Sequence, residues 1–115
     1  MFGCERLNQR DVSLERWRCR QLFKLGTPLN CVRFSPANSW AHEQAKAKLA
    51  YDALKEGHDF MTECEPAQGA GWSGKCDFVD LDLGLIREVV CSESEESIVR
   101  KRVKYPLPID VVRIV

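Results

Sequence analysis

One uninterrupted helical segment, WAHEQAKAKLAYDALKE at residues 40–56, limits the folds open to this chain. It contains no Gly or Pro, it is rich in Ala, Lys and Leu, which favour helix, and Gly57 ends it. Strand-like segments follow at 58–66, 75–82 and 85–91, then a helix capped by Ser92 or Ser94, and a final strand at 109–115. This order of helix, three strands, helix and strand predicts an α/β fold.

The first 38 residues form a basic extension in front of this predicted core. The segment 11–25 begins with the helix-start residues Asp11 and Ser13 and is followed by Gly26 and Pro28, so we expect a short helix there. A brief strand is expected at 30–36. We interpret the bases of the helix as phosphate contacts in a nucleic-acid-binding surface, and they are Arg16, Arg18, Arg20 and Lys24.

The length of 115 residues suits a single domain, and we treat residues 1–115 as one. The chain contains no apolar run of the roughly 18 residues that a membrane span needs, and no signal-peptide pattern, so we expect a soluble, cytoplasmic protein without a membrane partner. None of its six cysteines lies in a Cys-x-x-Cys pair. We therefore expect reduced and mostly buried thiols, with disulfides as the alternative in the cytosol of a hyperthermophile.

Charge is distributed unevenly although the formal net charge is zero. Residues 1–40 carry seven Lys and Arg against three Asp and Glu, residues 41–97 carry five against thirteen, and residues 98–115 carry five against one. Basic ends around an acidic middle suit a phosphate backbone held on the outside and a metal held in the centre. Ordinary solvated faces are the alternative interpretation.

Three acids of the acidic middle fall where apolar residues are expected. On the helix at 40–56, Glu43 lies on one line with Ala47, Ala50 and Leu54, because side chains advance by roughly 100° per residue. The neighbouring His42, on the flank of the helix, is interpreted as a surface residue. Taken alone, Glu43 could simply be a first-turn acid that the helix dipole favours.

The other two acids belong to neighbouring strands. Alternation places Asp77 on one face with Val79 and Leu81, and Glu88 on one face with Ile86 and Val90. A hairpin that turns at residues 83–84 would put position 77 across from position 90, so that the two carboxylates become diagonal neighbours on one surface. The alternatives are that Asp77 starts a strand at a sheet edge and that Glu88 pairs with Arg102.

Two like charges on an apolar face destabilise a fold by several kcal/mol unless they are protonated or neutralised. A divalent cation would supply that neutralisation. Carboxylate oxygens are hard ligands that suit Mg²⁺ or Mn²⁺, and the sequence has no clustered His and Cys set of the kind that zinc prefers. We therefore predict that Asp77 and Glu88, with Glu43, are metal ligands.

These segments resemble the PD-(D/E)xK nuclease superfamily, which has the restriction-endonuclease-like fold. HEQAKAKLAYDALKEGHDF is similar to its first helix and strand, with Glu43 as the motif acid. KCDFVDLD is similar to the strand that bears the metal-binding Asp, here Asp77, and LIREVVCSES to the next strand, with Glu88 as its acid. The likeness covers about residues 39–115, and archaeal Holliday-junction resolvases and small archaeal or viral nuclease-like proteins look nearest.

The resemblance implies a central mixed sheet of about four strands flanked by helices, and hydrolysis of DNA phosphodiester bonds with Mg²⁺ or Mn²⁺. One departure from the family pattern is Val90, which stands where the family has a lysine two residues after the Glu. We predict that Lys101 takes the role of that lysine in orienting the attacking water, with Lys75 on the Asp77 strand as another base nearby. Arg102 is a further candidate phosphate contact.

The resulting prediction is a metal-dependent endonuclease that acts on DNA, with branched or damaged DNA as candidate substrates. A homodimer is expected because one small domain offers one active site, and cutting both strands needs two. The alternative is a catalytically degenerate protein that keeps the nuclease fold and serves as a nucleic-acid-binding module or as a structural or inhibitory protein. Val90 favours this alternative.

Overall fold

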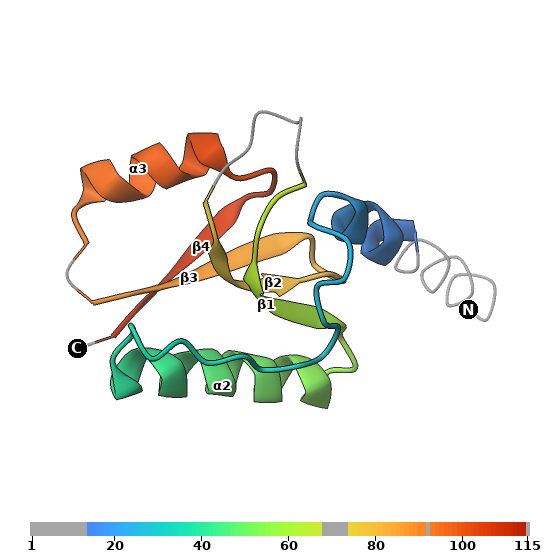
Figure 1. Cartoon of the computed structure of the whole chain (residues 1–115), viewed down its shortest axis with the longest axis horizontal. Coiled ribbons are helices and arrows are strands. Elements are labelled where there is room, and N and C mark those ends of the chain that lie inside the picture. Colours follow the sequence, from blue (N-terminus) through green and yellow to red (C-terminus); the bar gives the residue numbers. More distant parts are fainter. Residues whose placement is uncertain (1–13, 68–73, 92, 115) are drawn as a thin grey trace, which may run out of the picture.

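The computed structural model describes residues 14–67, 74–91 and 93–114. The order of its elements is α2 (Trp40–Lys55), β1 (Phe60–Cys64), β2 (Cys76–Asp80), β3 (Leu85–Val90), α3 (Glu95–Lys104) and β4 (Ile109–Arg113) (Figure 1). A further helix covers residues 14–21, within the predicted 11–25, whose first three residues lie outside the described part. The predicted order of elements is confirmed, and the element ends differ by a few residues.

The four strands form one open mixed sheet in the order β1-β2-β3-β4. β1 pairs with β2 and β2 with β3 in antiparallel fashion, whereas β3 pairs with β4 in parallel. A parallel pair needs a crossover connection, and α3 supplies it. The predicted α/β class with a four-stranded mixed sheet is therefore confirmed.

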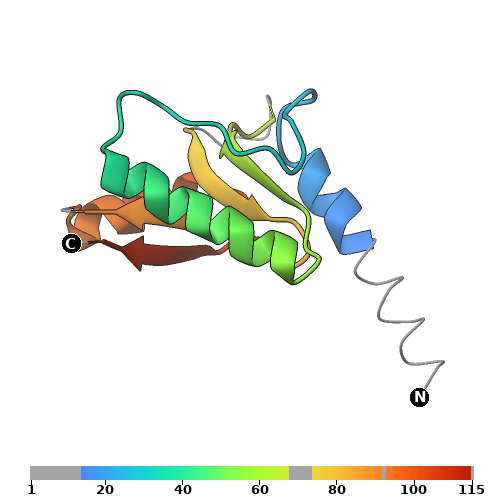
Figure 2. The same cartoon turned by 90° about the horizontal axis from the view of Figure 1, so that it is seen from below.

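The strand predicted at 30–36 is wrong. This segment has no strand assignment and runs alongside α2 (Figures 1 and 2). At Cys31 and Arg33 its backbone bonds to a side chain of β1 and not to a strand ladder, because the Thr62 hydroxyl donates to the Cys31 carbonyl oxygen and accepts from the Arg33 N–H, both at 2.9 Å. Asn30 also has a φ of 56°, which interrupts an extended conformation.

Two apolar clusters lie on opposite faces of the sheet, and α2 runs along one of these faces (Figure 2). Beneath α2, the rings of Phe60 and Phe78 stack at a centroid distance of 5.3 Å and pack with Ala50 and Ala53. On the other face, Cys19 and Phe23 from the first 38 residues join a buried cluster with strand residues and with Tyr105 at the end of α3. The N-terminal extension is therefore part of the core in its described portion.

The buried face of α2 differs from the predicted line. Leu54 is 54% exposed, and the residues that point inward are Glu43, Lys46, Ala50 and Ala53. The true buried face is thus rotated by roughly 50° about the helix axis from the predicted one. The reason is Lys46, which is buried because nearby carboxylates neutralise its charge. A prediction from apolar residues alone places such a charged side chain on the surface.

Both long helices begin at a serine cap. The Ser39 hydroxyl accepts the His42 N–H at 3.2 Å, and the Ser94 hydroxyl accepts the Ser97 N–H at the same distance. Such caps satisfy backbone donors that the first turn leaves without partners. Ser94 is therefore the cap of α3, and Ser92 lies outside the described residues.

The described cysteines are all free thiols, with Cys19, Cys64 and Cys76 buried and Cys31 and Cys91 exposed. The prediction of mostly buried thiols holds for three of the five that the structure describes. Within the described ranges, no helix is both long enough and apolar enough to cross a membrane.

Candidate functional site

Asp77 on β2 and Glu88 on β3 are brought together, in a closer arrangement than the predicted one. The paired residues are Val79 with Ile86 and Phe78 with Arg87, so the predicted diagonal register is wrong by two residues. Continued by one step, the observed register sets Asp77 directly opposite Glu88. The reason is the turn, which spans residues 81–84 and not only 83–84.

Each acid bonds to the backbone of the other strand. The Asp77 N–H donates to Glu88 Oε1 at 2.9 Å, and the Val89 N–H donates to Asp77 Oδ2 at 2.9 Å. The two carboxylates thus replace ladder contacts at the point where β2 and β3 separate. Their side chains are held in place by the sheet itself, which suits a preorganised site.

Asp77 points toward α2, so its predicted place on the face of Val79 and Leu81 is wrong. Cys76, predicted on the opposite face, packs with Val79 instead. The cause lies in the neighbouring strand, where the pairing passes from Thr62–Phe78 to Cys64–Cys76 across a residue with left-handed backbone, Glu63, at a φ of 51°. Such an irregularity re-aims the side chains that follow it.

Burial and mutual repulsion make the two acids hard to ionise. Burial raises the pKa of Glu88 to about 7, and the neighbouring Asp77 charge adds to the rise. Burial likewise raises the pKa of Asp77, against the lowering effect of its bond from the Val89 N–H. Keeping both acids ionised therefore costs free energy, and a positive charge placed near them would lower that cost.

Glu43, on the first turn of α2, is buried but fully used by other partners. Its Oε1 accepts from Asn38 Nδ2 at 2.9 Å and lies 3.0 Å from His42 Nδ1. Its Oε2 accepts from the Ser35 N–H at 3.1 Å and pairs with Lys46 Nζ at 2.8 Å. Burial alone would raise the pKa of Glu43, but these bonds outweigh it and hold the value at about 2.

His42 links Glu43 to the acid pair, so its interpretation as a surface residue is wrong. Its Nδ1 lies 3.0 Å from Glu43 Oε1 and its Nε2 lies 3.2 Å from Asp77 Oδ2. Because the Glu43 carboxylate is ionised and can only accept, we assign a proton to Nδ1. The adjacent Glu43 was the signal in the sequence, since a buried acid beside a histidine can fix its ring.

Lys46 is a second residue that the sequence reasoning missed. Its side chain is completely buried, 2.8 Å from Glu43 Oε2 and 2.6 Å from Glu63 Oε1. Glu63 in turn pairs with Lys75 Nζ at 3.3 Å, at the mouth of the site. Because Lys46 follows Glu43 by three residues, the sequence indicates that the two share a helix face. The contact with Glu63 on β1 depends instead on the left-handed backbone of Glu63.

Lys101 reaches the acid pair from α3. Its Nζ lies 3.2 Å from Glu88 Oε2 and 2.8 Å from Glu93 Oε1. Burial would lower the pKa of Lys101, but the bonds to Glu93 and Glu88 outweigh it and raise the value. Lys101 is therefore a fixed positive charge beside Glu88, and the pairing of Glu88 with Arg102 does not form.

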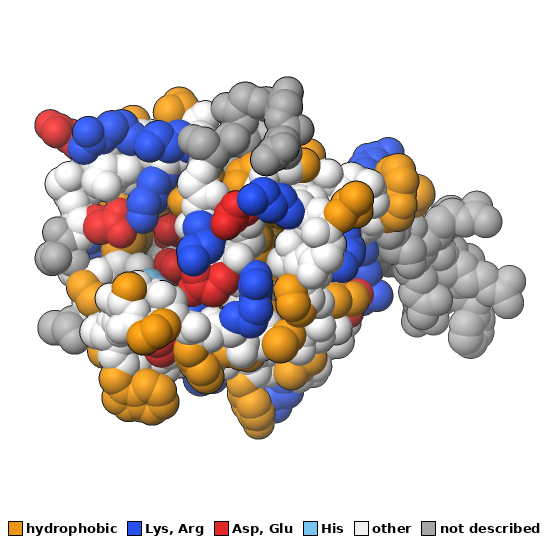
Figure 3. Space-filling view, in the orientation of Figure 1, with side chains coloured by type: hydrophobic (Ala, Val, Ile, Leu, Met, Phe, Trp, Pro, Cys, Tyr) orange, Lys and Arg blue, Asp and Glu red, His pale blue; other side chains and the backbone are white. Residues whose placement is uncertain are grey.

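A pocket of about 410 Å³ opens over these groups. Its lining includes His42, Lys75, Asp77, Glu88 and Lys101, drawn from α2, the segment before β2, β2, β3 and α3. The space-filling view shows Asp and Glu side chains near the centre of this face, with Lys and Arg side chains beside and above them (Figure 3). The pocket thus contains carboxylates, which can bind a metal ion, beside lysine side chains, which can bind a phosphate group.

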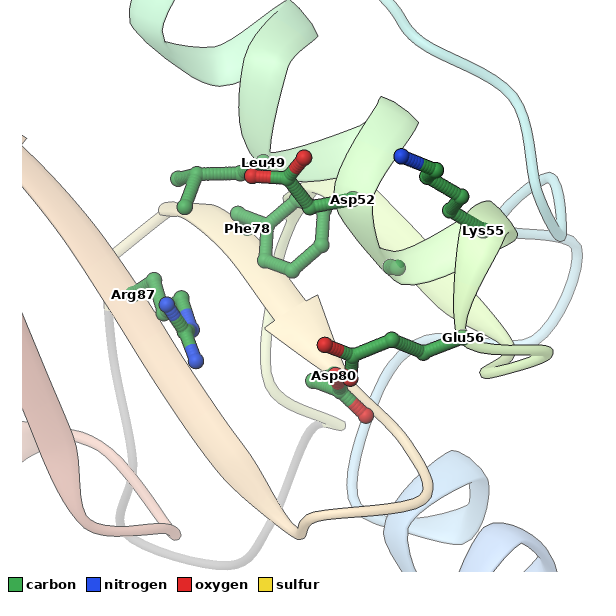
Figure 4. Close-up of a pocket in the computed structure, with 8 residues that line it drawn as sticks. Leu49, Asp52, Lys55, Glu56, Phe78, Asp80 and Arg87 are labelled. Carbon is green, nitrogen blue, oxygen red and sulfur yellow. The ribbon is translucent and has the colours of Figure 1, made fainter.

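A second pocket of about 450 Å³ lies toward the other end of α2, between that helix and strands β2 and β3 (Figure 4). It mixes Asp52, Lys55 and Glu56 with Arg87 over the ring of Phe78. Its acid Asp80 is occupied, since Oδ1 accepts two backbone N–H groups and Oδ2 lies 2.9 Å from His58 Nδ1. The size of this pocket is comparable, but the first pocket holds the perturbed acids.

The N-terminal bases are mostly bound within the fold. Arg16 pairs with Asp82 through two guanidinium nitrogens, Arg20 donates to a backbone carbonyl at 3.0 Å, and Lys24 pairs with Glu65. Arg18 and Arg102 are exposed and form no ion pair in the described portion of the chain. Of the five predicted phosphate contacts, these two present their charge to solvent.

The donor set fits a hard divalent cation in part. Asp77 and Glu88 offer neighbouring carboxylates, and Mg²⁺ commonly binds through one or two carboxylates together with waters and substrate phosphates. Glu43 has both oxygens saturated and does not face that position. In residues 14–67, 74–91 and 93–114, no group of three or more His, Cys, Asp and Glu side chains is arranged to hold a metal ion.

Comparisons of the chain with protein-family models, with curated proteins and with solved structures gave no match.

Proposed function

We propose that the protein is a metal-dependent nuclease of the PD-(D/E)xK type that hydrolyses DNA. The observation that carries the proposal is the buried pair Asp77 and Glu88, joined across β2 and β3 and contacted by Lys101 in one pocket. The order of elements and the mixed sheet support the likeness to that superfamily. Cutting both strands of a duplex would require a homodimer, which we include in the proposal.

Asp77 and Glu88 would hold one Mg²⁺ or Mn²⁺ together with substrate oxygens. When bound, such an ion would supply activation of a water and stabilisation of the charge on the departing oxygen. Lys101 keeps its positive charge beside Glu88 and is placed to donate to a phosphate oxygen or to orient the water. His42 fixes the Asp77 carboxylate, and Glu43 fixes the His42 ring. Glu43 therefore acts as a positioning residue in this proposal.

A second candidate function is DNA binding without cleavage. The specific observation in its favour is Val90, which is buried at the position of the family lysine. Lys101 compensates only if it can leave one of its two carboxylate partners and turn toward the substrate.

A plasmid-nicking assay with Mg²⁺ or Mn²⁺ tests the proposal. We expect Asp77→Asn and Glu88→Gln each to reduce nicking by about a hundredfold or more, since each removes a charge that binds the ion. Asp110→Asn, an exposed acid on β4, is the matched control and should cut at the normal rate. Unchanged nicking in both site variants would rule out this site, and binding without nicking in the wild type would favour the second candidate.

A further inference from the structure

The exposed side of α3 carries a band of bases that starts at the candidate site. Lys101 faces Glu88. At roughly 100° per residue, Lys104 lies about 60° around the helix from Lys101, and Arg100 about 40° further in the same direction. Both residues are exposed. The three bases are spaced as neighbours on a helix surface and lead away from the pocket.

Arg102 lies on the opposite flank of the same helix. It is about 100° from Lys101 in the other direction, and Ile98, the buried residue of α3, falls between them. The side of the helix that faces the protein therefore separates Arg102 from the pocket. Of the exposed bases of α3, Arg100 and Lys104 continue the line of Lys101, whereas the predicted contact Arg102 does not.

These bases are available to a ligand. In the described residues, Arg100 and Lys104 form no ion pair, whereas Arg16 and Lys24 of the N-terminal extension do. In the space-filling view, Lys and Arg side chains gather over α3, above the acidic centre (Figure 3). The acids of α3 occupy its first turn, where Glu95 pairs with Arg113 and Glu96 lies one turn before Arg100. The band is thus complementary to a polyanion laid beside the pocket.

We propose that Arg100 and Lys104 bind the sugar-phosphate backbone of DNA and lead it to Lys101. This inference rests on the proposed function for the identity of the ligand. A path along α3 explains how a phosphate could approach two carboxylates that would otherwise repel it, because the cations of the band offset that repulsion at the pocket edge. The proposal replaces the N-terminal helix as the main phosphate-binding surface.

The test measures the binding of a labelled DNA duplex by fluorescence anisotropy, with EDTA present and over a range of KCl concentrations. We expect Arg100→Ala and Lys104→Ala each to weaken binding about three- to tenfold at low salt, and each to reduce the slope of log K against log salt by about 0.9. Arg102→Ala is the matched comparison, with the same charge and helix, and should weaken binding less than about twofold. Arg100→Lys should restore most of the binding.

Circular dichroism confirms that each variant keeps its helices. An equal loss in Arg102→Ala and Arg100→Ala would overturn the proposal, because net charge alone would then explain binding. Unchanged slopes in Arg100→Ala and Lys104→Ala, or a wild type without salt-dependent binding, would also overturn it. Since the measurement excludes divalent ions, the expected pattern together with an absence of nicking would sustain this inference and reject the proposed nuclease activity.

Discussion

Two carboxylates that lie opposite each other in neighbouring strands are the central feature at the level of single residues. Asp77 and Glu88 keep their places because each accepts a backbone N–H from the other strand. Their burial makes the negative charge expensive, and Lys101 offsets only part of it. The free energy that this arrangement costs should be visible in stability measurements.

The pH dependence of unfolding provides such a measurement. The pKa of Glu88 is raised from 4.5 to about 7 by burial and by Asp77, so the folded state binds this proton more tightly than the unfolded chain. Stability from this group is present below about pH 4.5 and is lost as the pH rises through 7. We expect the wild type to lose up to about 3 kcal/mol between pH 5 and pH 8 in urea unfolding with EDTA.

Glu88→Gln provides the comparison, because an amide does not ionise. Its free energy of unfolding should change less than that of the wild type over the same pH interval, so the variant gains relative stability at pH 8. Parallel curves for the two proteins would show that Glu88 ionises normally and would remove the electrostatic argument for a cation site.

Single residues also show where sequence reasoning stops. The apolar neighbours of Glu43 and Glu88 correctly indicated that these acids are buried, because periodicity reports which side of an element faces inward. His42 and Lys46 were missed because their burial depends on partners from other elements, Asp77 and Glu63. Glu43 on the same helix is a local signal for both residues, but their partners on the strands are set by tertiary structure.

At the level of elements, α2 is the clearest case in which charge enters a core. Lys46 sits between two carboxylates, so Lys46→Met would remove the buried positive charge that neutralises Glu43 and Glu63, and we expect it to lower the free energy of unfolding by about 3–5 kcal/mol. Lys48→Met is the matched control on the same helix. Lys48 pairs with Asp52 in solvent, and its loss should change stability by less than about 0.5 kcal/mol in the same urea titration.

A similar effect of both substitutions would contradict the structural role of Lys46. The comparison is sharp because the two positions share residue type, helix and substitution, and differ in burial and partners.

The sheet shows the limits of alternation as a guide. Regular alternation placed Asp77 on the wrong face, because Glu63 on the adjacent strand takes a left-handed conformation that glycine usually supplies. The hairpin register was also wrong by two residues, since the turn is longer than the Leu83–Gly84 pair suggested. In both cases the error lies at the site, where local rules are most often broken.

For the whole molecule, the described N-terminal extension is built into the same core as the sheet. Phe23 is buried among Cys19, Met61 and Val79, so we expect Phe23→Ala to lower the free energy of unfolding by about 3–5 kcal/mol. Leu25, which is 93% exposed, is the control, and Leu25→Ala should have little effect. Thermal unfolding by circular dichroism would distinguish the two, and a small effect of Phe23→Ala would mean that the extension folds apart from the sheet.

The α/β class and the order of elements followed from the sequence because the helix at 40–56, the turn residues and the caps give strong local signals. The integration of residues 14–38 did not, because it depends on contacts with β1, such as the bonds of the Thr62 hydroxyl to Cys31 and Arg33, that no local pattern reports. The same limit applies to the site. Its acids were predicted from the apolar residues around them in the sequence. The contacts that join these acids through His42 and Lys46 were not predicted.

The bonds that Asp77 and Glu88 make across the strands have a consequence for how such a protein could change over generations. Because both acids help to hold the sheet together, a lineage that abandoned cleavage would still be under pressure to keep them. Retention of the two acids in related chains would therefore be poor evidence of an active enzyme. Retention of Lys101 on α3 would be better evidence of activity, because this residue supports the sheet less directly.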